Sequence, residues 1–393
     1  MRTQVGIIGA GPAGLLLSHL LHLQGIESVV LESRSYDYIT TRIRAGLMEQ
    51  NTVDLLNEVG LAKNLNKVAL PHDGVQFTFD GVLRRINMQE LIGRRVTIYG
   101  QQLIVKDMAD IRERAGGEIL YEAEATQISN LEGKPSITFT HNGQEQILEC
   151  DFLAGCDGFH GLSRPSIPKN LRKDFDRIYP FGWLGLLIAA APPSEELVYC
   201  HSPTGFALFS MRSEEVTRAY LQVRPDDSLE NWSEDRIWSE LRGRLGQHDG
   251  LRLVEGEILQ KVITPMRSWV SEPMQIGNLY LAGDSAHIVP PTGAKGMNLA
   301  IADVCVLSRG LIDFYQNKNW DYLNSYSETC LRRVWRAEHF SWWMTTMLHR
   351  FYDSNPFDHK RQIAELHTVF DSDAGSRLVA ENYAGLPLEP WHP

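Results

Sequence analysis

A glycine-rich turn near the start of the chain has the residue types and spacing needed to bind a diphosphate. Gly9, Gly11 and Gly14 form a G-x-G-x-x-G pattern after the apolar run 4–8, and leucines then recur at helical spacing. A strand, turn and helix in this order would present backbone amides and a helix N-terminus to a pyrophosphate. Glu32 ends the next β-branched run, where a carboxylate can accept a ribose hydroxyl. Taken alone, the pattern fits FAD, NAD or a plain tight turn.

Two later segments place an aspartate where a short strand meets a turn. The first is Gly-Cys-Asp-Gly at 155–158, which contains Asp157, and the second is Gly-Asp at 283–284, after the apolar run 279–281. Each aspartate by itself also fits an ordinary turn residue. Because Asp284 would follow a buried strand, its carboxylate is well placed to accept hydrogen bonds from cofactor hydroxyls.

In this order the three segments resemble those of the class A flavoprotein monooxygenases, in which they surround one FAD. The similarity extends to Pro-Pro-Thr-Gly-Ala-Lys-Gly-Met-Asn at 290–298 and Arg-Ile-Arg-Ala-Gly at 42–46, with spacing kept over nearly all 393 residues. The resemblance implies an enzyme that uses FAD, NAD(P)H, O2 and a flavin C4a-hydroperoxide to convert 4-hydroxybenzoate into 3,4-dihydroxybenzoate (protocatechuate). Hydroxylation of 4-aminobenzoate or 3-hydroxybenzoate, a flavin oxidase and a non-catalytic FAD-binding protein stay open.

The resemblance also implies which residues contact FAD. Arg44 would supply a charge-assisted partner for the diphosphate. The helix N-terminus after Gly293 would stabilise negative charge on the reduced flavin. Lys295 either adds to that field or is an exposed loop lysine without a catalytic task. The expected FAD-binding residues are Gly9, Gly11, Gly14, Glu32, Arg42, Arg44, Gln101, Asp157, Asp284, Lys295, Gly296 and Asn298.

A second group of residues has the chemistry to bind an aromatic carboxylate. Ser210 and Arg212 lie two apart on one expected strand, and Tyr220 lies on the next, so one anion can contact all three. A guanidinium matches a carboxylate with two parallel hydrogen bonds. Arginines on strands are usually solvated, and it is the resemblance that implies the clamp. It likewise ties Trp183 and Arg218 to movement of the flavin.

The resemblance assigns activation of the substrate phenol to Tyr199 and Tyr383, with His72 as a histidine near the surface. An ionised phenol makes the ring a better nucleophile, so a relay that removes the proton lowers the barrier. Pro291 would offer its carbonyl to the substrate hydroxyl. Without the resemblance, the tyrosines read as packed core aromatics and His72 as a surface imidazole.

The nicotinamide donor has no Rossmann turn of its own, because the chain contains no second G-x-G-x-x-G. It is therefore expected to bind transiently at the surface. Ser33 stands where NADPH-specific relatives carry arginine, and Arg34 is the candidate replacement, so NADPH, NADH or both stay open. The residues expected to contact NAD(P)H are Ser33, Arg34, Tyr38, Arg42, His160, Arg164 and Arg267.

The elements that must position these groups indicate an α/β protein: a Rossmann-like FAD-binding domain with an inserted β-sheet substrate domain and a C-terminal helical region. The range 46–67 is expected to be helical. The expected domains are a discontinuous FAD-binding domain at 1–70, 99–175 and 266–345, a substrate-binding β-sheet domain at 71–98 and 176–265, and the helical region at 346–393.

Composition narrows the remaining choices. A formal net charge of −11, from 38 basic and 49 acidic residues, disfavours nucleic acid as a partner. The five cysteines are scattered and form no CxxC pair, which favours reduced thiols and a cytoplasmic protein. Cys/His clusters and HExxH are missing, so no metal is expected. The apolar stretches 5–21 and 181–193 are too short or interrupted to span a membrane. The family is commonly dimeric, so a homodimer is expected.

Overall fold

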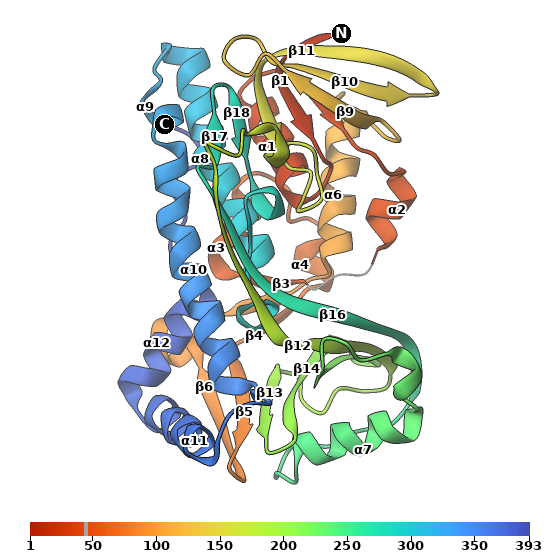
Figure 1. Cartoon of the computed structure of the whole chain (residues 1–393), viewed down its shortest axis with the longest axis vertical. Helices are drawn as coiled ribbons and strands as arrows, with labels where there is room; N and C mark the ends of the chain where they lie inside the picture. Colours follow the sequence, from red (N-terminus) through yellow and green to blue (C-terminus); the bar gives the residue numbers. More distant parts are fainter. Residues whose placement is uncertain (43–45) are drawn as a thin grey trace.

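Two eight-stranded sheets lie one above the other along the long axis of the molecule (Figure 1). The computed structural model describes residues 1–42 and 46–393. A small three-stranded sheet lies between the large ones and consists of β3 (Leu47–Glu49), β7 (Val96–Ile98) and β4 (Leu70–His72).

The upper sheet in Figure 1 is mostly parallel at its centre, in the order β17-β18-β11-β1-β2-β8, and β10 and β9 extend it from β11. Its central strands are largely buried, including all of β2 and the run from Val5 to Ile8 in β1, as is usual for parallel sheets. The strands are β1 (Arg2–Ile8), β2 (Ser28–Leu31), β8 (Glu118–Leu120), β9 (Glu124–Ser129), β10 (Ser136–His141), β11 (Gln144–Gly155), β17 (Gln275–Ile276) and β18 (Leu279–Leu281).

The helices of the upper part pack around this sheet. The helix expected over 46–67 is wrong, because that range holds β3 and two shorter helices, the first of which is followed by Gly60 with a left-handed φ of 77°. The helices are α1 (Pro12–Leu23), α2 (Tyr36–Thr41), α3 (Gln50–Glu58), α4 (Leu65–Val68), α6 (Gln101–Arg114), α8 (Gly296–Asn317) and α9 (Asp321–Asn324).

The lower sheet has the order β19-β16-β12-β15-β14-β13-β5-β6 and takes strands from both predicted inserts. One face packs against α7 (Glu234–Leu245) through residues such as Ala207 and Leu221, and the opposite face carries the polar and aromatic groups discussed below. The strands are β5 (Gly74–Phe79), β6 (Val82–Asn87), β12 (Lys173–Ala189), β13 (Val198–Ser202), β14 (Gly205–Ser213), β15 (Val216–Val223), β16 (Glu257–Glu272) and β19 (His287–Ile288), and α5 (Met88–Ile92) follows β6.

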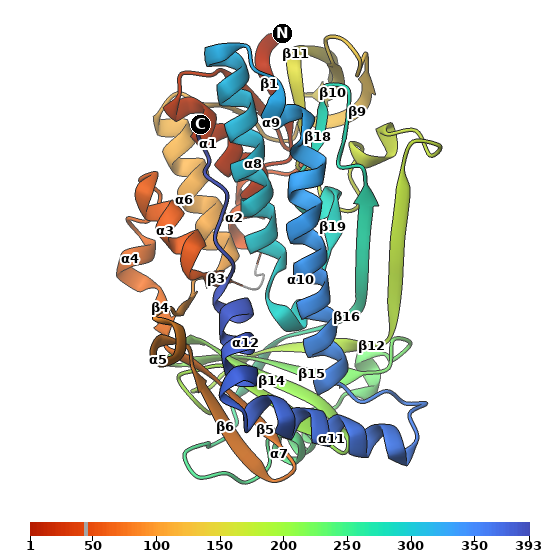
Figure 2. The ribbon, with the colours of Figure 1, turned by 90° about the vertical axis from the view of Figure 1, so that its left-hand side faces the viewer.

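The C-terminal helices join the two parts. The long helix α10 (Tyr326–Leu348) runs from the upper part to the lower sheet, where α11 (Pro356–Phe370) and α12 (Asp373–Ala384) follow it (Figure 2). The end of the chain then returns upward, and the Trp391 indole donates to Glu58 over 2.7 Å. Among the described residues, no helix has the length and apolar character needed to cross a membrane.

Candidate active site

The glycine-rich turn that contains Gly9, Gly11 and Gly14, called the fingerprint turn below, is shaped so that a ligand can approach its backbone closely. Gly9 has a left-handed φ of 103°, and a β-carbon at Gly14 would collide with the Gly9 carbonyl, so α1 packs tightly against the turn. A β-carbon at Gly11, by contrast, would point into open space at the N-terminus of α1. That space, edged by backbone amides, fits the pyrophosphate of a dinucleotide.

Glu32 lies buried at the end of β2 and is bonded to the turn itself. One carboxylate oxygen accepts the Ala10 amide over 2.8 Å, and the other accepts the Arg34 amide over 2.8 Å. A carboxylate has about four acceptor sites, so capacity for a ribose hydroxyl remains. Glu32 therefore shapes the turn in addition to its predicted contact with FAD.

Glu32→Gln should weaken FAD binding by about tenfold, because the amide keeps the size but places an N–H₂ against a backbone donor. The FAD dissociation constant of the deflavinated protein measures this. Glu27→Gln, at an exposed position before the same strand, is the matched control and should bind FAD normally. A Glu32→Gln protein with wild-type affinity for FAD would count against the ribose contact.

Asp157 organises the turn after β11. Its Oδ2 accepts both the amide and the hydroxyl of Ser163, at 2.8 and 2.9 Å, and a β-carbon at Gly161 would collide with its carboxylate. Burial raises the pKa of the Asp157 carboxyl. Its Oδ1 is buried without a hydrogen-bond partner among the described residues, which fits a donor from a bound cofactor.

The second aspartate segment is fixed from α8. The Gly283 amide donates to Asp303 Oδ2 over 2.9 Å, and His287 Nε2 lies 2.7 Å from the same oxygen. Burial opposes the charged imidazole, but the Asp303 carboxylate raises the pKa of His287 above its usual value. Asp284 lies exposed beyond β18, at the carboxyl end of the sheet where α/β proteins bind ligands.

The 290–298 segment crosses from the lower sheet to the start of α8. Asn298 makes four hydrogen bonds, donating to the carbonyls of Leu47 and Ala294 and accepting from the Glu49 amide and the Thr52 hydroxyl. Both N–H groups and both lone pairs of the Asn298 amide are therefore used to join β3 and α3 to this segment. Its predicted contact with FAD would be indirect.

Lys295 is not the exposed loop lysine that the sequence left open. It is buried, forms a 2.6 Å ion pair with Glu49, and donates to the carbonyls of Asn382 and Tyr383. Burial lowers the pKa of Lys295, while Glu49 opposes this. Because its three donors have protein acceptors, Lys295 ties α12 to the predicted flavin segment.

Four other predicted FAD contacts are less defined. Gln101 begins α6, and a β-carbon at Gly296 would meet open space at the first position of α8. Arg42 donates to the Tyr38 hydroxyl over 3.1 Å. Arg44 lies outside the described residues.

The polar face of the lower sheet collects the predicted substrate residues. Tyr199 pairs with Leu208, which pairs with Tyr220, so these side chains lie in one cross-strand row. Ser210 is buried and lies two residues after Leu208 on β14, so its side chain is on the same face.

Arg212 lies at an irregularity in β14, where the register shifts between Met211 and Ser213. The alternation of side chains between the two faces of a strand therefore does not set the direction of the Arg212 side chain, because a bulge changes where a side chain points. Burial lowers the pKa of Arg212, and its main electrostatic neighbours are Tyr220 and Arg218. Its Nε is buried without a hydrogen-bond partner among the described residues, which suits an incoming carboxylate.

The structure brings the two predicted phenol residues into direct contact. The hydroxyls of Tyr199 and Tyr383 lie 2.7 Å apart, and Tyr199 also donates to the Thr292 carbonyl over 3.0 Å. Thr292 directly follows Pro291, the residue expected to offer its carbonyl to the substrate. Burial raises the pKa of both tyrosines, so both phenols are neutral at pH 7.

His72 is not a surface imidazole. It lies on β4, only 4% exposed, and neither ring nitrogen has a hydrogen-bond partner among the described residues. Burial lowers the pKa of His72, so the neutral ring can accept a proton only transiently.

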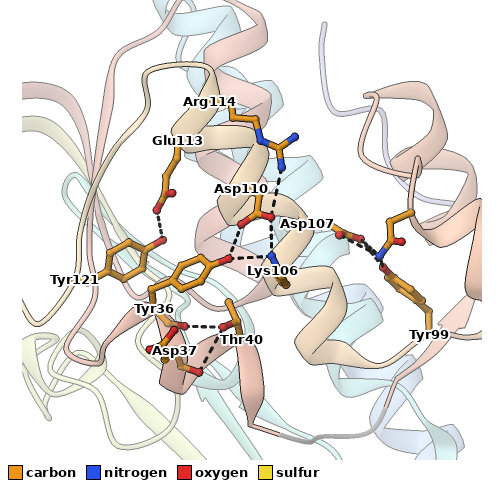
Figure 3. A network of polar contacts seen from close by, with 11 residues as sticks. Tyr36, Asp37, Thr40, Tyr99, Lys106, Asp107, Asp110, Glu113, Arg114 and Tyr121 are labelled. Carbon is orange, nitrogen blue, oxygen red and sulfur yellow. Dashed lines mark hydrogen bonds and ion pairs between the residues drawn. The ribbon is translucent and has the colours of Figure 1, made fainter.

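The predicted NAD(P)H residues form two groups. In the first, the guanidinium groups of Arg34 and Arg42 lie 5.4 and 5.7 Å from the Tyr38 ring, beside exposed Ser33. Tyr38 lies on α2, which a hydrogen-bond network connects to α6. Tyr36 of α2 donates to Asp110 of α6 over 2.5 Å, and Lys106 of α6 donates to both residues (Figure 3).

In the second group, Arg164 is packed between two aromatic rings, 4.5 Å from Phe159 and 4.3 Å from Trp269. Its Nη1 is buried without a partner among the described residues. Arg267 also lies over Phe159 but is held by a bidentate ion pair with Asp176, at 2.6 and 2.7 Å. His160 makes an edge contact with Phe159.

Sequence reasoning missed Glu49, Thr345 and His349, which hold site residues through side-chain hydrogen bonds. Ser341 and Thr345 on α10, and His349 directly after it, are polar at intervals of four. That spacing marks one helix face and was a usable signal.

Comparisons with known proteins agree with this geometry. A family model described as FAD binding domain matches residues 2–341. A p-nitrophenol 4-monooxygenase structure from Pseudomonas putida DLL-E4 has a TM-score of 0.82 at 18% identity and covers 98% of this chain and 99% of that one. Its similarity supports the fold. The chain belongs to the FAD-binding domain family of flavoprotein monooxygenases, so the predicted fold class and resemblance are confirmed.

Within that class, p-hydroxybenzoate hydroxylase from Acinetobacter baylyi is 50% identical over 390 residues, which cover 99% of this chain and 96% of that protein. A more distant relative is the 3-(3-hydroxy-phenyl)propionate/3-hydroxycinnamic acid hydroxylase of Escherichia coli O81, 25% identical over 329 residues. The match covers 81% of this chain and 57% of that enzyme.

Proposed function

We propose that this flavin-dependent aromatic monooxygenase hydroxylates 4-hydroxybenzoate at its 3-position, using FAD, O2 and NAD(P)H, to give 3,4-dihydroxybenzoate. The observation that carries the proposal is the 2.7 Å contact between Tyr199 and Tyr383 beside a sheet face that also bears Tyr220, an electrostatic neighbour of Arg212. The 50% identity to a p-hydroxybenzoate hydroxylase supports the same substrate.

The residues present fit FAD. The space at Gly11 suits the pyrophosphate, Glu32 and Asp157 have spare acceptor capacity, and Asp284 lies at the edge expected for the ribityl chain. Bound FAD supplies hydride acceptance from NAD(P)H and activation of O2 for oxygen transfer to the ring.

The substrate is held at both ends. Arg212, with Ser210 and Tyr220, binds the carboxylate, and Tyr199 binds the phenol that lies opposite it on the ring. A para-substituted benzoate spans these two groups, whereas the hydroxyl of 3-hydroxybenzoate would point away from Tyr199. The amine of 4-aminobenzoate reaches Tyr199 but cannot supply an oxyanion, so it should be a poor substrate.

Tyr199 can pass the phenol proton onward because its hydroxyl has two acceptors. It donates to Thr292 or turns toward Tyr383, and its remaining lone pair accepts the substrate O–H. Transfer through Tyr199 and Tyr383 leaves a phenolate in which the ring carbon ortho to the oxygen, the 3-position, is electron-rich. Pro291 and His72 are proposed as the substrate-side carbonyl and the outer proton acceptor.

NAD(P)H is proposed to bind at the two surface groups described above. Arg34, Tyr38 and Arg42 would bind the nucleotide end, where exposed guanidinium groups can meet a 2′-phosphate. Arg164, whose buried Nη1 has no hydrogen-bond partner within residues 1–42 and 46–393, would bind the diphosphate. Arg34 supports use of NADPH, and the absence of a second arginine at Ser33 supports use of NADH as well.

Arg164→Gln should raise the KM for NADPH about tenfold, the value of one charge-assisted hydrogen bond, with little change in 4-hydroxybenzoate affinity. Arg177→Gln removes an exposed arginine from β12 and serves as the control. Steady-state kinetics at saturating 4-hydroxybenzoate give the comparison. Equal KM values for the wild type and both variants would remove Arg164 from the nucleotide site.

We further propose that the chain is a cytoplasmic homodimer. The five buried free cysteines support a reducing compartment, and the resemblance supports the dimer. Light scattering coupled to size exclusion measures the assembly: a mass near twice 44.5 kDa agrees with the proposal, and a monomer contradicts it.

A substrate panel tests the proposed function. The holoenzyme is mixed with NADPH or NADH and with 4-hydroxybenzoate, 3-hydroxybenzoate, 4-aminobenzoate or benzoate, and nucleotide oxidation, peroxide and ring products are measured. The proposal expects fast oxidation and a dihydroxylated product with 4-hydroxybenzoate. Peroxide alone would indicate an oxidase, and no stimulated oxidation would indicate a binding protein.

A further inference from the structure

Polar groups spaced four residues apart connect α10 and its C-terminal end to the 291–293 segment and to the lower sheet. Ser341 and Thr345 lie against the 291–293 segment, where the Thr345 hydroxyl is 2.9 Å from that of Thr292. The third member, His349, directly follows α10 and reaches the lower sheet.

His349 is inserted into a stack of aromatic rings. Its ring centroid is 4.7 Å from that of Phe181 at 7° and 4.2 Å from that of Phe206 at 24°. The Trp183 indole N–H donates to His349 Nε2 over 2.7 Å. The side chains of His349 and Trp183 are both buried.

The hydrogen bonds define the tautomer of His349. Because Nε2 accepts from Trp183, the ring proton resides on Nδ1, which donates to the Thr345 carbonyl over 3.0 Å. Burial lowers the pKa of His349 to about 3, so the ring stays neutral and Nε2 stays an acceptor at physiological pH.

Trp183 connects this stack to the predicted carboxylate clamp. Its ring centroid lies 4.8 Å from that of Tyr220, at 45°. Tyr220 in turn is an electrostatic neighbour of Arg212. The orientation of the indole therefore limits where the Tyr220 ring, and with it the clamp, can settle.

We propose that His349 is a positioning residue of the substrate site, which fixes Trp183 by accepting its indole N–H and thereby holds Tyr220 in place for the carboxylate. This inference rests on the proposed function. It assigns His349 no contact with the substrate, so its effect should appear in substrate affinity and not in FAD content.

Dissociation constants of 4-hydroxybenzoate, measured on the holoenzyme from the change in flavin absorbance, test the inference. His349→Phe keeps a flat ring but removes the acceptor, and Trp183→Phe removes the donor. Each should weaken binding about 5- to 20-fold, the range for losing one buried hydrogen bond. The double variant should bind no more weakly than the worse single variant, because one bond links the two residues.

Two further variants separate positioning from general damage. His349→Gln places an amide oxygen near the former Nε2 and should restore most of the affinity. Trp343→Phe removes an indole of the same helix that donates to Glu365 of α11 over 2.8 Å, and this variant should bind within about twofold of wild type.

The results test the positioning role of His349 and the proposed function separately. Wild-type affinity in His349→Phe or Trp183→Phe, or losses that multiply in the double variant, would overturn the positioning role. If His349→Phe does not fold, Trp183→Phe and His349→Gln carry the same test. A wild-type enzyme that binds 4-hydroxybenzoate without hydroxylating it would overturn the function alone, and one that does not bind it would overturn both.

Discussion

Tyr199→Phe is expected to slow hydroxylation by about 10²- to 10⁴-fold while NAD(P)H oxidation continues, so that hydrogen peroxide replaces most of the dihydroxylated product. The substitution keeps the packed ring but removes the hydroxyl that contacts Tyr383 and Thr292. Without it, the substrate phenol has no path for its proton and the ring stays a weak nucleophile. Product and peroxide formed per nucleotide consumed give the measurement.

A second tyrosine provides the control for Tyr199. Tyr315 on α8 also has a hydrogen-bonded hydroxyl, 3.2 Å from Asp151, but it packs against Phe152 of the upper sheet and not against the polar face of the lower sheet. Tyr315→Phe should leave product formation fully coupled. Tyr383→Phe should resemble Tyr199→Phe in a milder form, since the first transfer step survives. Complete coupling in Tyr199→Phe would show that the phenol is activated in another way.

Arg212→Ala is expected to weaken binding of 4-hydroxybenzoate by about 2 to 5 kcal/mol, or roughly 30- to 5,000-fold. The carboxylate would lose its charged partner in a site where Ser210 and Tyr220 offer only hydroxyls. Titration of the holoenzyme with substrate measures the loss, and flavin reduction without substrate should be unchanged.

Arg212→Lys separates charge from geometry. Lysine restores the positive charge but not the two-pronged contact, so binding should recover only in part. A neutral analogue such as 4-hydroxybenzamide should bind the wild type weakly and lose little further affinity in Arg212→Ala. If the benzoate and the benzamide lose the same affinity, Arg212 does not bind the carboxylate.

The parts of the site that depend on local sequence were predictable. The fingerprint turn follows from glycine spacing, because the constraints at Gly9 and Gly14 come from the adjoining strand and helix. The α/β class follows from the alternation of apolar runs. In the range 46–67, however, helical spacing alone did not reveal that three elements share it.

Contacts between distant segments could not be read from residue types. The buried pair of Lys295 and Glu49 joins positions 246 apart, and only folding removes this lysine from solvent. The burial of His72 is likewise set by packing around β4. The irregular register at Arg212 depends on how β14 pairs with β15, so strict alternation was an incomplete guide there.

Turnover of 4-hydroxybenzoate by the wild-type holoenzyme under ¹⁸O₂ tests the central claim most directly. If Arg212 and Tyr199 hold the two ends of the ring, mass spectrometry and NMR should find 3,4-dihydroxybenzoate carrying one ¹⁸O, located at the 3-position. An unlabelled product, hydroxylation at another carbon, or peroxide without ring product would contradict it.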